Sequence, residues 1–105
     1  MKSNNVNNGE KVFIHVDDDV KELIPGFLQN RHRDVKTIIY ALEYGDYETI
    51  KLLGHSMRGS GNGYGFQEIT KIGKSIEMAA KDRNSEDIKK WIGELSSYLE
   101  RVEVV

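Results

Sequence analysis

Apolar residues along this chain recur mainly at helical spacing, and the longest run of this pattern begins at Pro25. From there to about Tyr44 the apolar positions fall inside an arc of about 120° at 3.6 residues per turn, which predicts one long amphipathic helix. Pro25 suits a first helical turn, where its missing N–H costs nothing, and Gly45 suits the stop. The positions on the predicted core face are Phe27, Leu28, Arg31, Val35, Ile38, Ile39 and Leu42.

Three further helices follow from the same pattern. Asp46 can cap a second helix that runs to about Gly61, and a third helix is predicted from about Phe66 to Lys81. Residues 82–85 predict a turn and a cap before a fourth helix. The apolar stripe of the third helix consists of Ile69, Ile72, Gly73, Ile76 and Ala80, and that of the fourth consists of Ile88, Trp91, Ile92, Leu95, Leu99 and Val102.

The N-terminal part of the chain has a different character. Residues 1–10 are polar and Asn-rich and are predicted to form a flexible tail, which leaves residues 11–105 as the domain. Residues 11–16 could be extended, and the carboxylates of residues 17–19 suit the N-terminus of a short additional helix. Four amphipathic helices with short connections then predict an all-α fold, an up-down-up-down antiparallel four-helix bundle with this short additional N-terminal helix.

Composition narrows the possible functions. The chain has 105 residues with 38% apolar content, which is enough for one core. Its net charge of -2 lacks the basic excess that nucleic-acid binding requires, and the absence of cysteine excludes a thiol nucleophile and disulfides. No apolar run approaches the roughly 18 residues needed to cross a bilayer. We therefore expect a cytoplasmic protein without nucleic-acid or membrane partners.

The second helix carries the most distinctive chemistry. At about 100° per residue, His55 lies about 140° from Ile50, Gly59 about 180° and Arg58 about 80°. The side of this helix around Ile50 is apolar and is predicted to face the bundle, so His55 is predicted to point toward solvent. The residues that share the bundle side with Ile50 are Leu53, Gly54, Met57 and Gly61.

This patch suits the transfer of a phosphoryl group. Histidine side chains titrate close to neutral pH, so a good fraction is neutral and nucleophilic in the cytosol. Phosphoryl transfer develops negative charge on the equatorial oxygens, and Arg58, one turn from His55, can stabilise that charge. Gly59 removes the side chain that would otherwise cover the ring. Its cost in helix propensity, roughly 1 kcal/mol against alanine, calls for a reason of this kind.

At these residues the chain resembles the histidine-containing phosphotransfer (HPt) domain family, whose core motif is a histidine followed at i+3 by lysine or arginine and at i+4 by glycine. Here the motif reads His55, Arg58, Gly59, and Gly65 follows at i+10. The resemblance implies a phosphorelay intermediate without kinase activity of its own. Such a protein accepts a phosphoryl group on its histidine from the aspartyl phosphate of a receiver domain and passes it to another response-regulator receiver.

The resemblance also implies partners and cofactors. The partners would be response-regulator receiver domains and, in some relays, a hybrid sensor histidine kinase. This chain would bind no cofactor and no metal, because the Mg²⁺ of the reaction sits in the partner receiver.

Further contacts are predicted around the histidine. Ser56 and Asn62 are candidates for hydrogen bonds to the phosphoryl oxygens. Leu52 lies three residues before the histidine and is apolar, yet it points away from the predicted core, which favours a docking contact with a partner. The predicted docking surface consists of Leu52, Ile24 and Leu28.

Other functions are compatible with the sequence. A non-catalytic helical bundle could bind and sequester a receiver domain or another signalling protein without accepting phosphate. A metal-binding bundle using His55 and nearby acids is weakly supported, because the three histidines are widely separated. The glycine-rich residues 59–65 follow a helix rather than a strand, which excludes a dinucleotide-binding loop. Since four helices in one chain can close a core, we expect a monomer.

Overall fold

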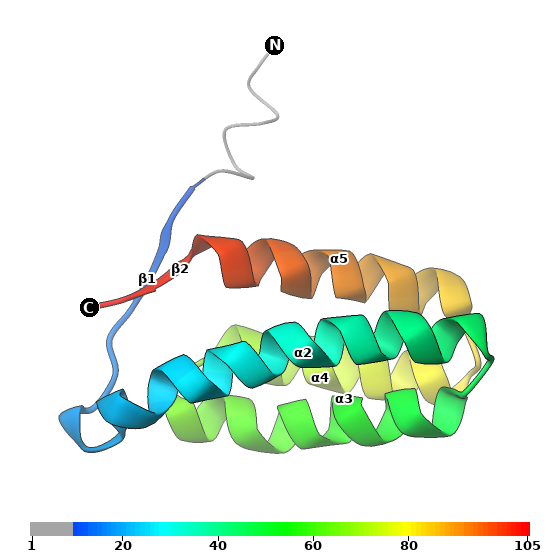
Figure 1. Cartoon of the computed structure of the whole chain (residues 1–105), viewed down its shortest axis with the longest axis horizontal. Helices are drawn as coiled ribbons and strands as arrows, with labels where there is room; N and C mark the ends of the chain where they lie inside the picture. Colours follow the sequence, from blue (N-terminus) through cyan, green and yellow to red (C-terminus); the bar gives the residue numbers. More distant parts are fainter. Residues whose placement is uncertain (1–9) are drawn as a thin grey trace, which may run out of the picture.

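The computed structural model describes residues 10–105, which are mostly helical. Four α-helices lie side by side (Figure 1): α2 (Ile24–Glu43), α3 (Tyr47–Gly61), α4 (Gln67–Lys81) and α5 (Ser85–Arg101). The shorter elements are the 3-10 helices η1 (Asp18–Leu23) and η2 (Asn62–Tyr64) and the strands β1 (Val12–Ile14) and β2 (Val102–Val104). The predicted flexible tail, residues 1–10, lies outside the described residues except for Glu10.

Local capping explains why α3 and α5 begin where the sequence predicts. The Asp46 side chain accepts a hydrogen bond of 3.1 Å from the backbone N–H of Thr49 at the start of α3. The hydrogen bonds from the Thr49 hydroxyl and N–H hold the pKa of Asp46 below its usual range. Asn84 caps α5 in the same way by accepting from the N–H of Asp87 at 3.1 Å. These side chains satisfy backbone donors that the first helical turn leaves without a partner.

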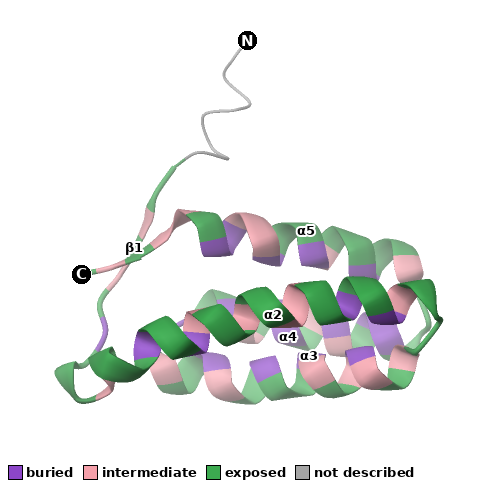
Figure 2. Ribbon diagram, in the orientation of Figure 1, coloured by how far each residue is buried: buried purple, intermediate pink, exposed green. Residues whose placement is uncertain are grey.

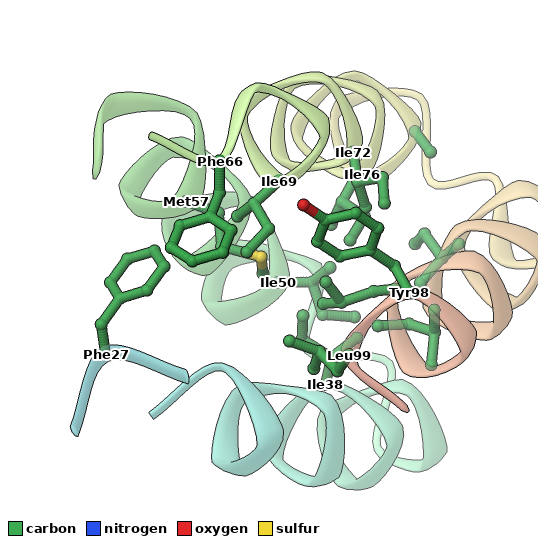
Figure 3. Close-up of a cluster of buried hydrophobic side chains, with 14 of the residues drawn as sticks. Phe27, Ile38, Ile50, Met57, Phe66, Ile69, Ile72, Ile76, Tyr98 and Leu99 are labelled. Atoms are coloured by element: carbon green, nitrogen blue, oxygen red, sulfur yellow. The ribbon is translucent and has the colours of Figure 1, made fainter. Parts of the chain in front are cut away.

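The core lies between the four helices (Figure 2), and most of its residues belong to the predicted apolar stripes. The ring of Phe66 stacks on that of Phe27 with centroids 5.5 Å apart. Tyr98 reaches the same core (Figure 3), and burial raises its pKa to about 12.

Since each helix has one apolar side only, none of the described helices is long and apolar enough to span a membrane. The largest fully buried side chains are Phe66, Ile38, Ile50, Met57, Ile69, Ile76, Ile88 and Leu95.

The end of the fourth helix differs from the prediction. The sequence places Val102 in the helical stripe, but α5 ends at Arg101 and Val102 begins β2. This strand pairs in parallel with β1, with Val102 opposite Val12 and Val104 opposite Ile14. The prediction for Val102 is wrong because pairing with a segment some 90 residues away replaces the last helical turn, and helical spacing within α5 carries no signal of that partner.

Two expectations for the N-terminal half also need correction. Ile39 is predicted on the core face of the long helix, but it is 48% exposed. The buried side of α2 is narrower than the predicted arc and centres on Ile38 and Ala41. The short helix predicted after Asp17 takes the form of η1, and the Asp17 side chain makes no capping hydrogen bond there.

Candidate phosphoryl-transfer site

Glycines fix α3 against α4, and this contact positions the site. A Cβ atom on Gly73 would lie 2.6 Å from the backbone nitrogen of Arg58, and a Cβ atom on Gly54 would lie 2.7 Å from the backbone nitrogen of Glu77. Gly61 lies equally tightly against α4. Backbones this close leave no room for side chains. The register of α3 on α4 is therefore set by direct backbone contact at these glycines.

This register brings Glu77 of α4 beside His55 of α3. Nδ1 of His55 lies 3.1 Å from Oε2 of Glu77. The His55 side chain is 62% exposed, whereas that of Glu77 is 17% exposed. The imidazole is thus held along one edge by a largely buried carboxylate and is open to solvent elsewhere, in agreement with the helical projection.

The contact with Glu77 gives the two ring nitrogens of His55 different roles. A carboxylate can only accept hydrogen bonds, so the hydrogen bond assigns the proton of the neutral imidazole to Nδ1, which donates it to Oε2. Nε2 then keeps its lone pair and is the ring nitrogen available to act as a nucleophile. Fixing the tautomer of a histidine through its second nitrogen is the arrangement that nucleophilic and metal-binding histidines share.

Arg58 approaches the same carboxylate from the next turn of α3. Its Nη1 lies 3.3 Å from Oε1 of Glu77, which makes an ion pair by distance. Oε1 nevertheless receives no hydrogen bond within the described chain, so the guanidinium is poorly aligned for one. Because the Arg58 side chain is 44% exposed, solvent screens the ion pair. The exposed part of the guanidinium is therefore open to a negatively charged group on His55.

Gly59 differs from the glycines that face α4. A Cβ atom at this position would meet no atom within 4 Å, so packing within the chain does not require a glycine here. The space beside His55 is open, and the residue is exposed. His55, Arg58 and Gly59 thus share one solvent-facing patch of α3.

The predicted apolar docking surface needs correction. Leu52 is 65% exposed, as its position on the helix predicts. Ile24 is only 3% exposed, so the prediction that it contacts a partner is wrong: this first residue of α2 turns its side chain into the core. Leu28 is partly buried against the core. The exposed apolar residue at the start of α2 is instead Leu23, which is 54% exposed.

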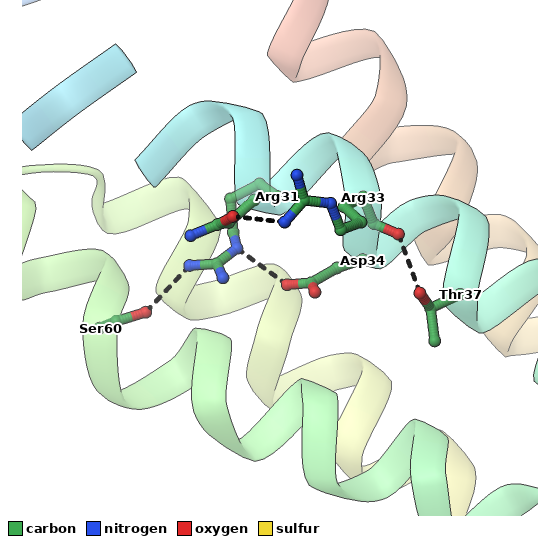
Figure 4. A network of polar contacts seen from close by, with 6 residues as sticks. Arg31, Arg33, Asp34, Thr37 and Ser60 are labelled. Carbon is green, nitrogen blue, oxygen red and sulfur yellow. Dashed lines mark hydrogen bonds and ion pairs between the residues drawn. The ribbon is translucent and has the colours of Figure 1, made fainter. Parts of the chain in front are cut away.

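A groove of about 400 Å³ lies between the start of α2 and the end of α3. In its wall, Nε of Arg31 lies 2.9 Å from Oδ2 of Asp34, and Nη1 donates to the Ser60 hydroxyl at 3.4 Å (Figure 4). Burial raises the pKa of Asp34, and the Arg31 charge opposes that shift. Ser56, which follows His55, lines this groove. The groove therefore presents two hydroxyl groups and an arginine held by Asp34 on the side of α3 that faces α2.

Asn62 lies at the end of α3, where its backbone N–H donates to Oγ1 of Thr70 at 2.8 Å. It is exposed, but it is about two helical turns from His55, farther along the helix than Ser56. The other histidines, His15 and His32, are exposed. Across residues 10–105, no group of three His, Cys, Asp or Glu side chains is arranged to hold a metal ion.

Glu77 is the residue of this site that sequence reasoning missed. It lies on a different helix from His55, and a projection of one helix cannot show what a second helix brings to it. The only signal in the sequence is an acid at i+4 from Gly73, on the edge of an otherwise apolar stripe. That signal becomes informative only when the register of α3 on α4 is known.

No protein-family model, curated protein or solved structure matches this chain. A function for the site is therefore inferred from its geometry and from the motif around His55.

Proposed function

We propose that this protein is a histidine phosphotransfer protein of a two-component phosphorelay, in which His55 carries the phosphoryl group. The observation that carries this proposal is the exposed imidazole of His55, bound through Nδ1 to Glu77 and free at Nε2. The resemblance of His55, Arg58 and Gly59 to the HPt motif supports the same function. In this role the protein passes the group from one receiver domain to another and has no kinase activity of its own.

In the proposed reaction, Nε2 of His55 attacks the phosphorus of an aspartyl phosphate in a receiver domain. The N–P bond forms while the bond from phosphorus to the aspartate oxygen breaks, and its electron pair returns to the aspartate carboxylate. The ring gains positive charge, which the Glu77 carboxylate offsets through the Nδ1 proton. Arg58 stabilises the negative charge on the equatorial oxygens. Transfer to a second receiver uses the same groups in reverse.

The partner is proposed to dock over the open side of α3. Gly59 lets its backbone approach the ring closely, and Leu52 offers an exposed apolar contact. Ser56 can donate a hydrogen bond to the phosphoryl group or to the partner, and Asn62 can contact the rim of the partner. The Mg²⁺ of the reaction belongs to the receiver, so no cofactor bound by this chain is part of the proposal.

The proposed architecture is an up-down-up-down antiparallel bundle with η1 as the additional N-terminal helical segment. It is supported by the short connections between the four α-helices, which favour antiparallel neighbours. Four helices supply the core within one chain, so the proposed working form is a monomer, located in the cytoplasm where receiver domains are found.

The test is phosphoryl transfer from a panel of phosphorylated receiver domains to the wild-type protein and to His55→Gln. We expect the wild type to acquire an acid-labile, base-stable label and the variant to acquire none, because glutamine is close in size but has no nucleophilic nitrogen. Circular dichroism should show equal helical content, since the side chain is exposed. Equal labelling of the two proteins would contradict the proposal.

The same experiment separates a phosphocarrier from a bundle that only sequesters a receiver. A sequestering protein would bind one of the receivers in a pull-down or by calorimetry and yet remain unlabelled. If the wild type binds a receiver but acquires no label, the protein is a sequestering bundle and the phosphocarrier proposal is wrong.

A further inference from the structure

The contact between α3 and α4 places two short charged segments opposite each other. Gly54 abuts Glu77, and Gly73 abuts Arg58, so residues 55–58 of α3 lie level with residues 74–77 of α4. Glu77 reaches both His55 and Arg58 on the exposed side of this contact. Lys74 precedes Glu77 by three residues, and residues at this spacing lie on the same side of a helix. Lys74 therefore lies along the same exposed edge, level with Arg58.

The charges at this edge do not balance once His55 is phosphorylated. A phosphoryl group carries about two negative charges at neutral pH. In the proposed reaction the Glu77 anion offsets the positive charge of the ring, so the single charge of Arg58 is left to meet the two negative charges of the phosphoryl group. Lys74 is exposed and forms no ion pair within residues 10–105. It is a cation free to move toward the phosphoryl oxygens.

We propose that Lys74 is a second phosphoryl-binding cation, which contacts the phosphoryl group on His55 from α4 while Arg58 contacts it from α3. This inference rests on the proposed function of His55. The flexible stem of lysine suits a contact that forms only when the anion arrives, because the ammonium can remain in solvent until then.

The neighbouring cations are placed less well for this role. Lys81 follows Glu77 by four residues, in the opposite direction along α4, and lines a separate pocket together with Lys51 and Arg83. Lys51 is paired with Glu48 at 3.0 Å. Lys74 is thus the free lysine of α4 whose position along the helix contact matches that of Arg58.

The experiment uses phosphoramidate, a small donor that phosphorylates histidine without a docked receiver, so that partner recognition does not enter the result. Phosphorylation is followed by intact mass for the wild type, Lys74→Ala and Lys74→Arg at low ionic strength, and the label acquired by His55→Gln is subtracted because His15 and His32 are also exposed. We expect Lys74→Ala to react about three- to fivefold more slowly, the upper part of the range for one screened charge, and Lys74→Arg to stay within about twofold of the wild type. The difference between wild type and Lys74→Ala should shrink at about 1 M salt.

Lys89→Ala is the matched control, because it removes the same charge from an exposed position on α5, which packs against α2 and α4. It should react like the wild type. Equal rates for Lys74→Ala, Lys89→Ala and wild type at low salt would overturn the role of Lys74 and leave His55 as the phosphorylated residue. A wild-type protein that phosphoramidate and phosphorylated receivers both fail to label would overturn both proposals.

Discussion

The two sides of α3 use glycine for opposite purposes. On the side that faces α4, a Cβ atom at Gly54 would come within 2.8 Å of backbone atoms of the neighbouring helix, whereas at Gly59 it would meet nothing within 4 Å. The side of α3 that carries Gly54 is covered by α4, and we call it the closed side. The side that carries Gly59 faces solvent, and we call it the open side. The difference teaches that the closed side determines where His55, Arg58 and Glu77 stand, while the open side determines what can reach them.

The closed side also explains how an exposed histidine can have a defined orientation. Exposed side chains usually sample several rotamers, and their ion pairs contribute little. Here the carboxylate partner of His55 belongs to a residue that is mostly buried, on a helix in backbone contact with α3. Because the backbone contact between α3 and α4 fixes Glu77, its carboxylate can hold the exposed imidazole of His55 in one orientation.

The strongest test of the closed side is Gly73→Ala. The added Cβ atom would lie 2.6 Å from the Arg58 nitrogen and 2.8 Å from the Gly54 carbonyl oxygen, and backbone atoms cannot move aside without separating the helices. We expect the free energy of unfolding, measured by urea denaturation, to fall by about 3 kcal/mol.

Gly93→Ala is its control, because a Cβ atom at this position on α5 would meet nothing within 4 Å. There the higher helix propensity of alanine should leave the free energy of unfolding unchanged or raise it by up to about 1 kcal/mol. If Gly73→Ala behaved like Gly93→Ala, the helices would have more freedom than the contact between α3 and α4 implies.

A smaller effect is expected for Glu77→Gln. Glu77 belongs to α4 and lies at the edge where α4 meets the open side of α3. Glutamine keeps the size of the side chain but removes the charge that fixes the Nδ1 proton and offsets the positive charge of the phosphorylated ring. We expect phosphorylation of His55 by phosphoramidate to slow roughly tenfold, which corresponds to about 1.4 kcal/mol. The unfolding curve should move little, since the partners of Glu77 are largely exposed. An unchanged rate would show that Glu77 does not orient the nucleophile.

The mildest change overall is expected on the open side, at Gly59→Ala. With free space around the new methyl group, the variant should be more stable by up to about 1 kcal/mol. Labelling by phosphoramidate should be unaffected, whereas transfer from a receiver should slow a few-fold because the methyl group stands between the two proteins. Equal slowing with both donors would instead place the effect of Gly59 within the chain itself.

The sequence predicts the helices and the His55 patch well, because both depend on local information. Helical spacing identifies Ile50 and Met57 as buried, and both are fully buried. Capping residues such as Asp46 locate the helix starts. The same helical spacing predicts His55 as exposed, and its exposure depends on nothing beyond its own helix and the core next to it.

The features that the sequence did not predict depend on contacts between distant segments. Glu77 becomes part of the site only through the register of α3 on α4, and Val102 leaves the helix because it pairs with Val12. Ile24 is a third case. It is the first residue of α2, and whether its side chain faces the core or the surface depends on the direction from which η1 leads into the helix. Each of these requires the relative placement of two elements, which helical spacing cannot supply.

The parallel pairing of β1 with β2 has a mechanical consequence. The chain enters the pair beside Val12 and leaves it beyond Val104, at opposite ends of the ladder. Tension applied between the two ends of the domain would therefore load all the hydrogen bonds of this ladder together, in shear, instead of peeling them apart one by one. The strand pair would carry this force before the helices do, so α3 and His55 would bear load only after the two strands had separated.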